Sequence, residues 1–153
     1  MSYLVDTSVL VRLANQQDAS YGIAWGAVTE LHRRGEVLHI ASQNLVEFLN
    51  VATRPLANNG LGLSPADAHK QLVQFESTFP LLAETVDIHP AWKTLVSVLG
   101  VIGKQVHDAR LVAICRVHGV SQVLTFNTAH FARLGTAGPT ITAVHPHDIQ
   151  PAP

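Results

Sequence analysis

The chain has 153 residues, of which 47% are hydrophobic and 14% charged, and its formal net charge is -1 at pH 7. This length and apolar content are typical of one globular domain, which we expect to span residues 1–153. The near-neutral charge excludes a strong overall field for nucleic acid, so a nucleic-acid partner would have to be held by a local patch or by metal.

The compartment is indicated by what the chain lacks. A single cysteine, Cys115, excludes an internal disulfide, and its apolar surroundings in 111–117 predict a buried thiol in a reducing compartment. The first residues lack the basic and apolar regions of a secretory signal. No apolar run approaches the roughly 20 residues that a membrane-spanning helix needs. We therefore expect a cytoplasmic protein without membrane association.

The first predicted element is a strand over residues 3–6, because this short run is apolar and β-prone, and it ends at Asp6. Thr7 and Ser8 follow with hydroxyl groups suited to starting a helix. The next segments alternate between helical and extended patterns. In chain order they are a helix over 19–34, a strand over 37–40, a helix capped by Ser42 that ends before Pro55, and a loop over 54–62.

The clearest helix start lies at Ser64, an N-cap residue followed by Pro65 at the first helical position and Asp67 at the third. This helix is expected to run to about residue 79. Shorter elements follow it. They are a short strand within 81–88, a helix from 89 to 99, a helix that begins at Asp108 and runs to 117, a strand over 122–126, a short helix over 129–134 and a strand over 140–144.

The alternation of strands and helices predicts an α/β fold, with a mostly parallel central sheet that helices cover on both faces. In such folds, ligands bind beyond the carboxyl ends of the strands. Asp6 and Asn127 both lie at predicted carboxyl ends of strands. We therefore expect these two distant residues to face one cleft.

Three acidic residues, Asp6, Glu47 and Asp108, stand in otherwise apolar stretches. Each has an ordinary structural explanation: Asp6 as a helix cap, Asp108 as a partner of helix N-terminal N–H groups, and Glu47 on an exposed helix edge. If all three converge, their repulsion would raise at least one pKa and destabilise the fold unless a cation neutralises them. With no cysteine pair and no histidines at zinc spacing, the oxygen ligands favour Mg²⁺ or Mn²⁺.

Other chemistries lack their sequence requirements. The chain has no Walker-type loop, no G-x-G-x-x-G after its first strand and no G-x-S-x-G nucleophile elbow, which excludes the corresponding NTPase, dinucleotide and esterase functions. A phosphatase with Asp6 as nucleophile would need an acid two residues later, where Ser8 stands. His107 and His130 lie beside the acidic and Asn127 motifs and are candidate contacts to a phosphate.

Four motifs in order carry a resemblance to a known family. The chain resembles PIN-domain ribonucleases, particularly the VapC-type toxins of bacterial toxin–antitoxin pairs, over nearly its whole length. The resemblance implies the PIN-like three-layer α/β fold. Its carriers are Val5-Asp-Thr-Ser-Val-Leu-Val11, Asn44-Leu-Val-Glu-Phe48, Val106-His-Asp-Ala-Arg-Leu-Val-Ala113 and Val123-Leu-Thr-Phe-Asn-Thr-Ala-His-Phe131.

The resemblance also implies an activity. The three acids would bind one or two Mg²⁺ or Mn²⁺ ions, which activate water for attack on an RNA phosphodiester, so the chain would be an endoribonuclease and a hydrolase. Many family members carry a fourth acid where this chain has Asn127. The implied site comprises Asp6, Glu47 and Asp108 as metal ligands, Asn127 as an auxiliary catalytic group, and Thr7, Ser8 and Thr125 as hydrogen-bonding residues.

The neutral Asn127 removes one negative charge, which should weaken metal affinity or favour a single ion. This departure motivates an alternative: a catalytically weak or inactive PIN-like domain that binds RNA or a protein. A structure-specific DNA nuclease with the same metal chemistry and a purely structural α/β domain are further alternatives.

The resemblance implies partners as well. Arg12 and Arg54 are the first candidates for contact with RNA phosphates, since both lie near the acidic motifs in sequence. VapC-like toxins usually pair with a small antitoxin protein and usually form homodimers. The stretch 10–13 and the helix with Trp25, Val28 and Leu31 are candidate surfaces for such partners.

Overall fold

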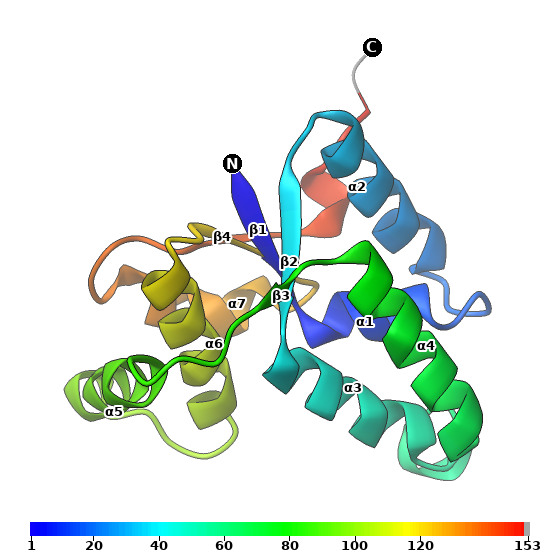
Figure 1. Ribbon diagram of the computed structural model, residues 1–153, viewed down its shortest axis with the longest axis horizontal. Coiled ribbons are helices and arrows are strands. Elements are labelled where there is room, and N and C mark those ends of the chain that lie inside the picture. Colours follow the sequence, from blue (N-terminus) through cyan, green and yellow to red (C-terminus); the bar gives the residue numbers. More distant parts are fainter. Residues whose placement is uncertain (152–153) are drawn as a thin grey trace.

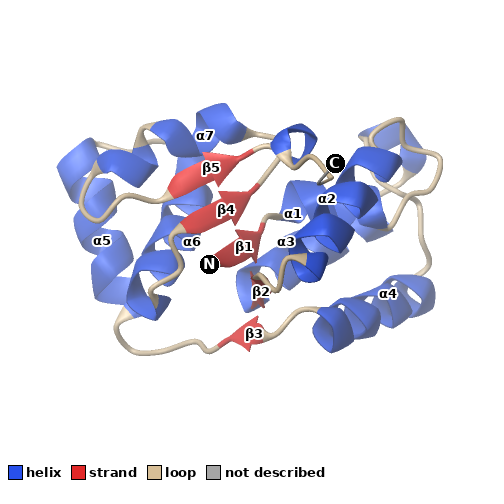
Figure 2. Ribbon diagram, turned by 90° about the horizontal axis from the view of Figure 1, so that it is seen from above, coloured by secondary structure: helices blue, strands red, loops and turns tan. Residues whose placement is uncertain are grey.

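The protein is described by a computed structural model over residues 1–151. Five strands form one sheet in the order β3-β2-β1-β4-β5, and each neighbouring pair is parallel. The carboxyl ends of the strands therefore lie at one edge of the sheet (Figure 2). The strands are β1 (Ser2–Val5), β2 (Val37–Ala41), β3 (Leu81–Leu82), β4 (Gln122–Leu124) and β5 (Thr142–Val144).

Helices cover both faces of this sheet, with α1 to α4 on one side and α5 to α7 on the other (Figure 1). This arrangement confirms the predicted three-layer α/β fold, with a sheet that is parallel throughout. No helix within residues 1–151 is long and apolar enough to cross a membrane. The helices are α1 (Thr7–Leu13), α2 (Tyr21–Arg33), α3 (Ser42–Thr53), α4 (Pro65–Thr78), α5 (Ile88–Leu99), α6 (Gln105–His118) and α7 (Thr128–Ala132), with short 3₁₀ turns at Leu56–Asn58, Leu134–Thr136 and Pro146–Asp148.

Alternate residues of the strands supply two hydrophobic cores, one on each face of the sheet. Tyr3 and Val5 pack against the layer of α1 to α4, whereas Leu4 between them packs against α5 and α6. Cys115 belongs to the second core and is fully buried, as predicted. Burial raises the pKa of its thiol to about 12, so this thiol is unreactive at neutral pH.

The predicted start at Ser64 is confirmed in detail: its Oγ accepts a hydrogen bond from the backbone N–H of Asp67 at 3.1 Å, and Pro65 is the first helical residue. The predicted cap at Ser42 is wrong. The N-cap residue of helix α3 is Ala41, and its backbone N–H donates to the side-chain Oδ1 of Asn44 at 2.9 Å.

Two element boundaries differ from the predictions by more than two residues. The strand expected within 81–88 ends at Leu82, because Val86 is exposed and Ile88 already begins α5. Helix α6 begins at Gln105, so Asp108 lies inside its first turn rather than at its start. The Asp108 side chain therefore projects from within a helix and not from the residue that caps it.

Candidate active site

The predicted acids meet at the carboxyl edge of the sheet. Asp6 directly follows β1, Glu47 lies midway along α3, Asp108 lies in the first turn of α6, and Asn127 follows β4. These three acids and Asn127 line a single cavity of about 260 Å³, as Asp6 and Asn127 were expected to do. The other lining residues are Thr7, Ser8, Val11, Arg12 and Val51.

Asp6 is buried and receives two hydroxyl donors. Ser8 Oγ donates to Asp6 Oδ2 at 2.8 Å, and Thr125 Oγ1 donates to the same oxygen at 2.7 Å. The side chain of Asp6 makes no capping bond to α1, so the capping explanation of this residue does not apply. The hydroxyls are themselves held in place, since the N–H groups of Phe126 and Asn127 donate to Ser8 Oγ and Thr125 Oγ1 at 3.1 and 2.9 Å.

Glu47 is held at both carboxylate oxygens. Thr7 Oγ1 donates to Oε2 at 2.8 Å, and Gln43 Nε2 donates to Oε1 at 2.8 Å. Asn44 Nδ2 in turn donates to Thr7 Oγ1 at 3.3 Å. Glu47 therefore faces the cavity, and its position is not that of a freely solvated charge on a helix edge.

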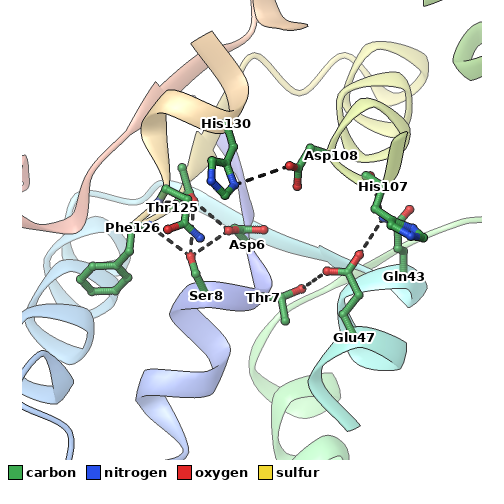
Figure 3. A network of polar contacts seen from close by, with 11 residues as sticks. Asp6, Thr7, Ser8, Gln43, Glu47, His107, Asp108, Thr125, Phe126 and His130 are labelled. Carbon is green, nitrogen blue, oxygen red and sulfur yellow. Dashed lines mark hydrogen bonds and ion pairs between the residues drawn. The ribbon is translucent and has the colours of Figure 1, made fainter. Parts of the chain in front are cut away.

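Asp108 differs from the other two acids because no hydrogen bond reaches its carboxylate within residues 1–151. The imidazole of His130 lies beside it, with its Nδ1 at 3.6 Å from Asp108 Oδ2 (Figure 3). Burial, followed by the negative charges of Asp6 and Glu47, raises the pKa of Asp108 to about 6 from its ordinary 3.8, although His130 opposes this shift. Burial and the charges of the two other carboxylates thus act together to raise the pKa of Asp108.

A divalent cation is chemically suited to this cavity, since the donors are oxygens and the negative charges lack a full counter-charge. Within residues 1–151, however, no three side chains among His, Cys, Asp and Glu lie close enough to hold one ion directly. Mg²⁺ usually keeps several of its waters and takes only one or two carboxylates from the protein. The spacing therefore fits a partly hydrated Mg²⁺ or Mn²⁺ better than a zinc-type cage.

The two predicted RNA-contacting arginines are placed differently. Arg12 lines the cavity, its Nη1 donates to the carbonyl oxygen of Ser8 at 2.8 Å, and its guanidinium lies 4.2 Å from the centre of the Phe126 ring. Its Nε is buried and has no hydrogen-bond partner within the described residues. Arg54 lies at the end of α3 and does not line the cavity.

The candidate partner surfaces are partly internal. Val28 and Leu31 of α2 are buried in the core, as is Leu10. Trp25 is 57% exposed and lines a separate cleft of about 500 Å³, which also includes Leu13 and residues of α4. Trp25 is the exposed part of the expected surface, and Val11, Arg12 and Leu13 are half-buried.

The site predicted from the sequence does not include Gln43, Glu84 or Arg110. Gln43 lies one helical turn before Glu47, and this spacing of four residues was the available signal. Glu84 pairs with Arg110 at 2.8 Å across segments distant in sequence, for which no local pattern exists. Arg110 Nη2 donates to Glu84 Oε2 at 2.8 Å.

Comparison with known proteins identifies the family. The family model described as PIN domain matches residues 3–136, which is most of the chain. The chain belongs to the PIN domain family. No curated protein gives a significant sequence match to it.

Solved structures share the fold of this PIN domain. VapBC2 from Rickettsia felis, bound to a DNA fragment from its promoter, has a TM-score of 0.70 and 16% identity, covering 95% of this chain and 98% of that one. VapBC-1 from nontypeable Haemophilus influenzae has a TM-score of 0.68 and 13% identity over the same shares. VapC20 from Mycobacterium tuberculosis, a toxin that cleaves the sarcin-ricin loop, has a TM-score of 0.61 and 21% identity over 86% and 94%. At these identities the likeness concerns the fold.

Replacing Asp108 with Asn should stabilise the metal-free PIN domain at neutral pH. The folded state keeps the Asp108 proton up to about pH 6, whereas the unfolded chain releases it near 3.8, so ionisation lowers the free energy of unfolding as pH rises between these values. In EDTA at pH 7.5 we expect the free energy of unfolding of Asp108→Asn to exceed that of the wild type by roughly 1 to 3 kcal/mol. Below about pH 4 the two proteins should have the same free energy of unfolding.

Urea unfolding of both proteins across this pH range measures the difference, with exposed Asp148→Asn as the matched control. A variant that is less stable than the wild type at pH 7.5 would contradict the crowding of the three carboxylates.

Proposed function

We propose that this PIN domain is a Mg²⁺- or Mn²⁺-dependent endoribonuclease and the toxin of a type II toxin–antitoxin pair. The observation that carries the proposal is the meeting of Asp6, Glu47, Asp108 and Asn127 around one cavity of a PIN domain. The pKa of Asp108 supports it, because a site that crowds carboxylates without a full counter-charge is one that a cation would stabilise.

The residues have distinct parts in the proposed reaction. Asp6, Glu47 and Asp108 would hold the ion, which would lower the pKa of an attacking water and neutralise charge on the phosphoryl oxygens. Ser8 and Thr125 orient Asp6, whose other oxygen, Oδ1, receives no hydrogen bond within residues 1–151. The exposed Asn127 side chain would add a neutral oxygen at the mouth of the cavity.

Arg12 is the proposed contact to an RNA phosphate. Its guanidinium lines the same cavity as the acids and makes no ion pair within the described residues, so its charge is available to a ligand. The Ser8 carbonyl and the Phe126 ring fix its position, which lowers the entropy that binding a phosphate would cost. Arg54, outside the cavity, would contribute less.

The toxin role draws its support from the structural neighbours. Two of them are VapBC assemblies, and a third is a toxin that cleaves the sarcin-ricin loop. We propose that a small antitoxin covers the cleft that contains the exposed Trp25, and that the chain forms a homodimer. The chain is proposed to act in the cytoplasm.

One alternative has specific support: a catalytically weak or inactive PIN-like domain that binds RNA or a protein. It is favoured by the neutral Asn127 and by the absence, within residues 1–151, of three acidic or histidine side chains close enough to share one ion. Against it stands the array of four donors that hold Asp6 and Glu47 toward the cavity, since a binding module gains nothing from crowding carboxylates.

Cleavage of total cellular RNA tests the nuclease. The purified protein should cleave RNA with Mn²⁺ or Mg²⁺, lose cleavage in EDTA, and lose about a hundredfold or more in rate with Asp108→Asn, because a catalytic metal supplies several kcal/mol of transition-state stabilisation. Asp148→Asn is the matched control. Intact RNA together with cleaved single-stranded DNA would indicate a DNA nuclease, and equal rates for Asp108→Asn and wild type would exclude this site.

Salt dependence tests Arg12. RNA binding is measured by fluorescence anisotropy at several KCl concentrations in the Asp108→Asn background, which leaves the RNA uncut. Arg12→Gln should reduce the slope of log affinity against log salt by about 0.7, the value for one phosphate contact to a single strand. Arg54→Gln should leave the slope nearly unchanged. The reverse result would move the phosphate contact from the cavity to the end of α3.

Inducible expression tests the toxin role. The wild-type chain should arrest growth of a bacterial host, whereas Asp6→Asn, expressed at the same level, should not, since it weakens the proposed metal site. Equal growth of the two strains would remove the toxin function while leaving the nuclease assay unaffected.

A further inference from the structure

We infer that Gln43 is a positioning residue of the site: its side-chain amide sets the carboxylate of Glu47 relative to the start of α6, which carries Asp108. The inference rests on the proposed function of this cavity as a metal centre. It concerns a residue that belongs to none of the four motifs and whose own side chain does not line the cavity.

The amide of Gln43 is engaged on three sides. Its Nε2 donates to Glu47 Oε1 at 2.8 Å and to the carbonyl oxygen of His107 at 2.8 Å, so both of its N–H groups are used. Its Oε1 accepts from Arg110 Nη1 at 3.1 Å. Figure 3 shows Gln43 between Glu47 and His107, the residue before Asp108.

These partners allow only one orientation of the amide. A flipped amide would turn its oxygen toward a carboxylate and a carbonyl, both acceptors, and its NH₂ toward the guanidinium of Arg110, a donor. All three hydrogen bonds would then be lost. The side chain of Gln43 can therefore serve Glu47 only as a donor.

Arg110 is in turn fixed from the far side. Its Nη2 donates to Glu84 Oε2 at 2.8 Å, and Ser42 Oγ donates to Glu84 Oε1 at 3.0 Å. The bond from Arg110, with a smaller contribution from Ser42, lowers the pKa of Glu84, which keeps this carboxylate ionised and the pair intact at neutral pH. The network thus ties the segments after β2 and β3 to α6.

The location of this network matters because the two acids come from opposite layers. Helix α3 carries Glu47 on one face of the sheet, and α6 carries Asp108 on the other (Figure 1). Gln43, in the first turn of α3, donates to His107 in the first turn of α6 and so joins the starts of the two helices. Thr7 holds the second oxygen of Glu47, so the carboxylate has little freedom left. Removing such a supporting hydrogen bond commonly lowers metal affinity by about 10- to 100-fold.

The first arm of the test uses metal-free protein in EDTA. A double-mutant cycle of Gln43→Leu and Glu47→Leu is measured by urea unfolding. The effect of the double variant on the unfolding equilibrium constant should be smaller than the product of the two single effects by roughly threefold or more, because the side chains are in contact. Strictly multiplicative effects would overturn the inference whatever the protein does with metal.

The second arm measures Mn²⁺ affinity of the full chain by calorimetry. Gln43→Leu should lower the affinity 10- to 100-fold. Gln74→Leu, an exposed glutamine on α4, is the matched control and should bind as the wild type does. Ile114→Val in α6 controls for stability: it removes a buried methylene, and a residue with a merely structural role would resemble it in lowering stability without changing Mn²⁺ affinity.

The two proposals fail in different ways. Mn²⁺ binding by Gln43→Leu within twofold of the wild type would overturn the positioning role and leave the metal site intact. Absence of Mn²⁺ binding by the wild type would overturn the metal site and, with it, any role of Gln43 in positioning a ligand.

Discussion

Three carboxylates meet beyond the carboxyl edge of the sheet, and their mutual repulsion is the constraint to which the surrounding polar groups respond. Asp6 and Glu47 each receive two hydrogen bonds from donors held by their own contacts. Asp108 receives none within residues 1–151, and its pKa is raised first by burial and then by the negative charge of Asp6. The site therefore consists of two carboxylates fixed by the protein and one that a ligand would have to satisfy.

The parallel sheet explains why these groups come together. In a parallel sheet every strand ends at the same edge, so residues that follow β1 and β4 become neighbours although they are far apart in sequence. The two layers then contribute one acid each, from α3 and α6. A site assembled in this way depends on how the layers are held together, and polar side chains that cross between them become part of the site.

Much of this arrangement is predictable from sequence, because it depends on local signals. The acids stand out as charges in apolar stretches, and the ends of β1 and β4 locate Asp6 and Asn127 at one edge once the sheet is taken as parallel. The start of α6 was not predictable in the same way. Its N-cap, Lys104, makes no side-chain capping bond, so the first residue that indicates a helix start in the sequence is Asp108, three residues after the true beginning at Gln105.

Other features depend on tertiary contacts that no local pattern encodes. Val86 and Ile88 are apolar residues that follow Leu81 and Leu82 closely, yet one is exposed and the other begins a helix, because burial is decided by packing against α6 and not by composition. The pairing of Glu84 with Arg110 likewise joins a loop to a helix in another layer. Such pairs become visible only when the layers are placed side by side.

The positions of the two tryptophans have a spectroscopic consequence. Trp92 donates its indole N–H to the carbonyl oxygen of Val106 at 2.8 Å, two residues before Asp108, whereas Trp25 is exposed at the cleft beside α4. Trp25 is open to a quencher dissolved in the solvent, whereas Trp92 is only partly accessible. The unlabelled chain therefore carries two separable optical reporters, one for the beginning of α6 and one for the face where a partner would dock.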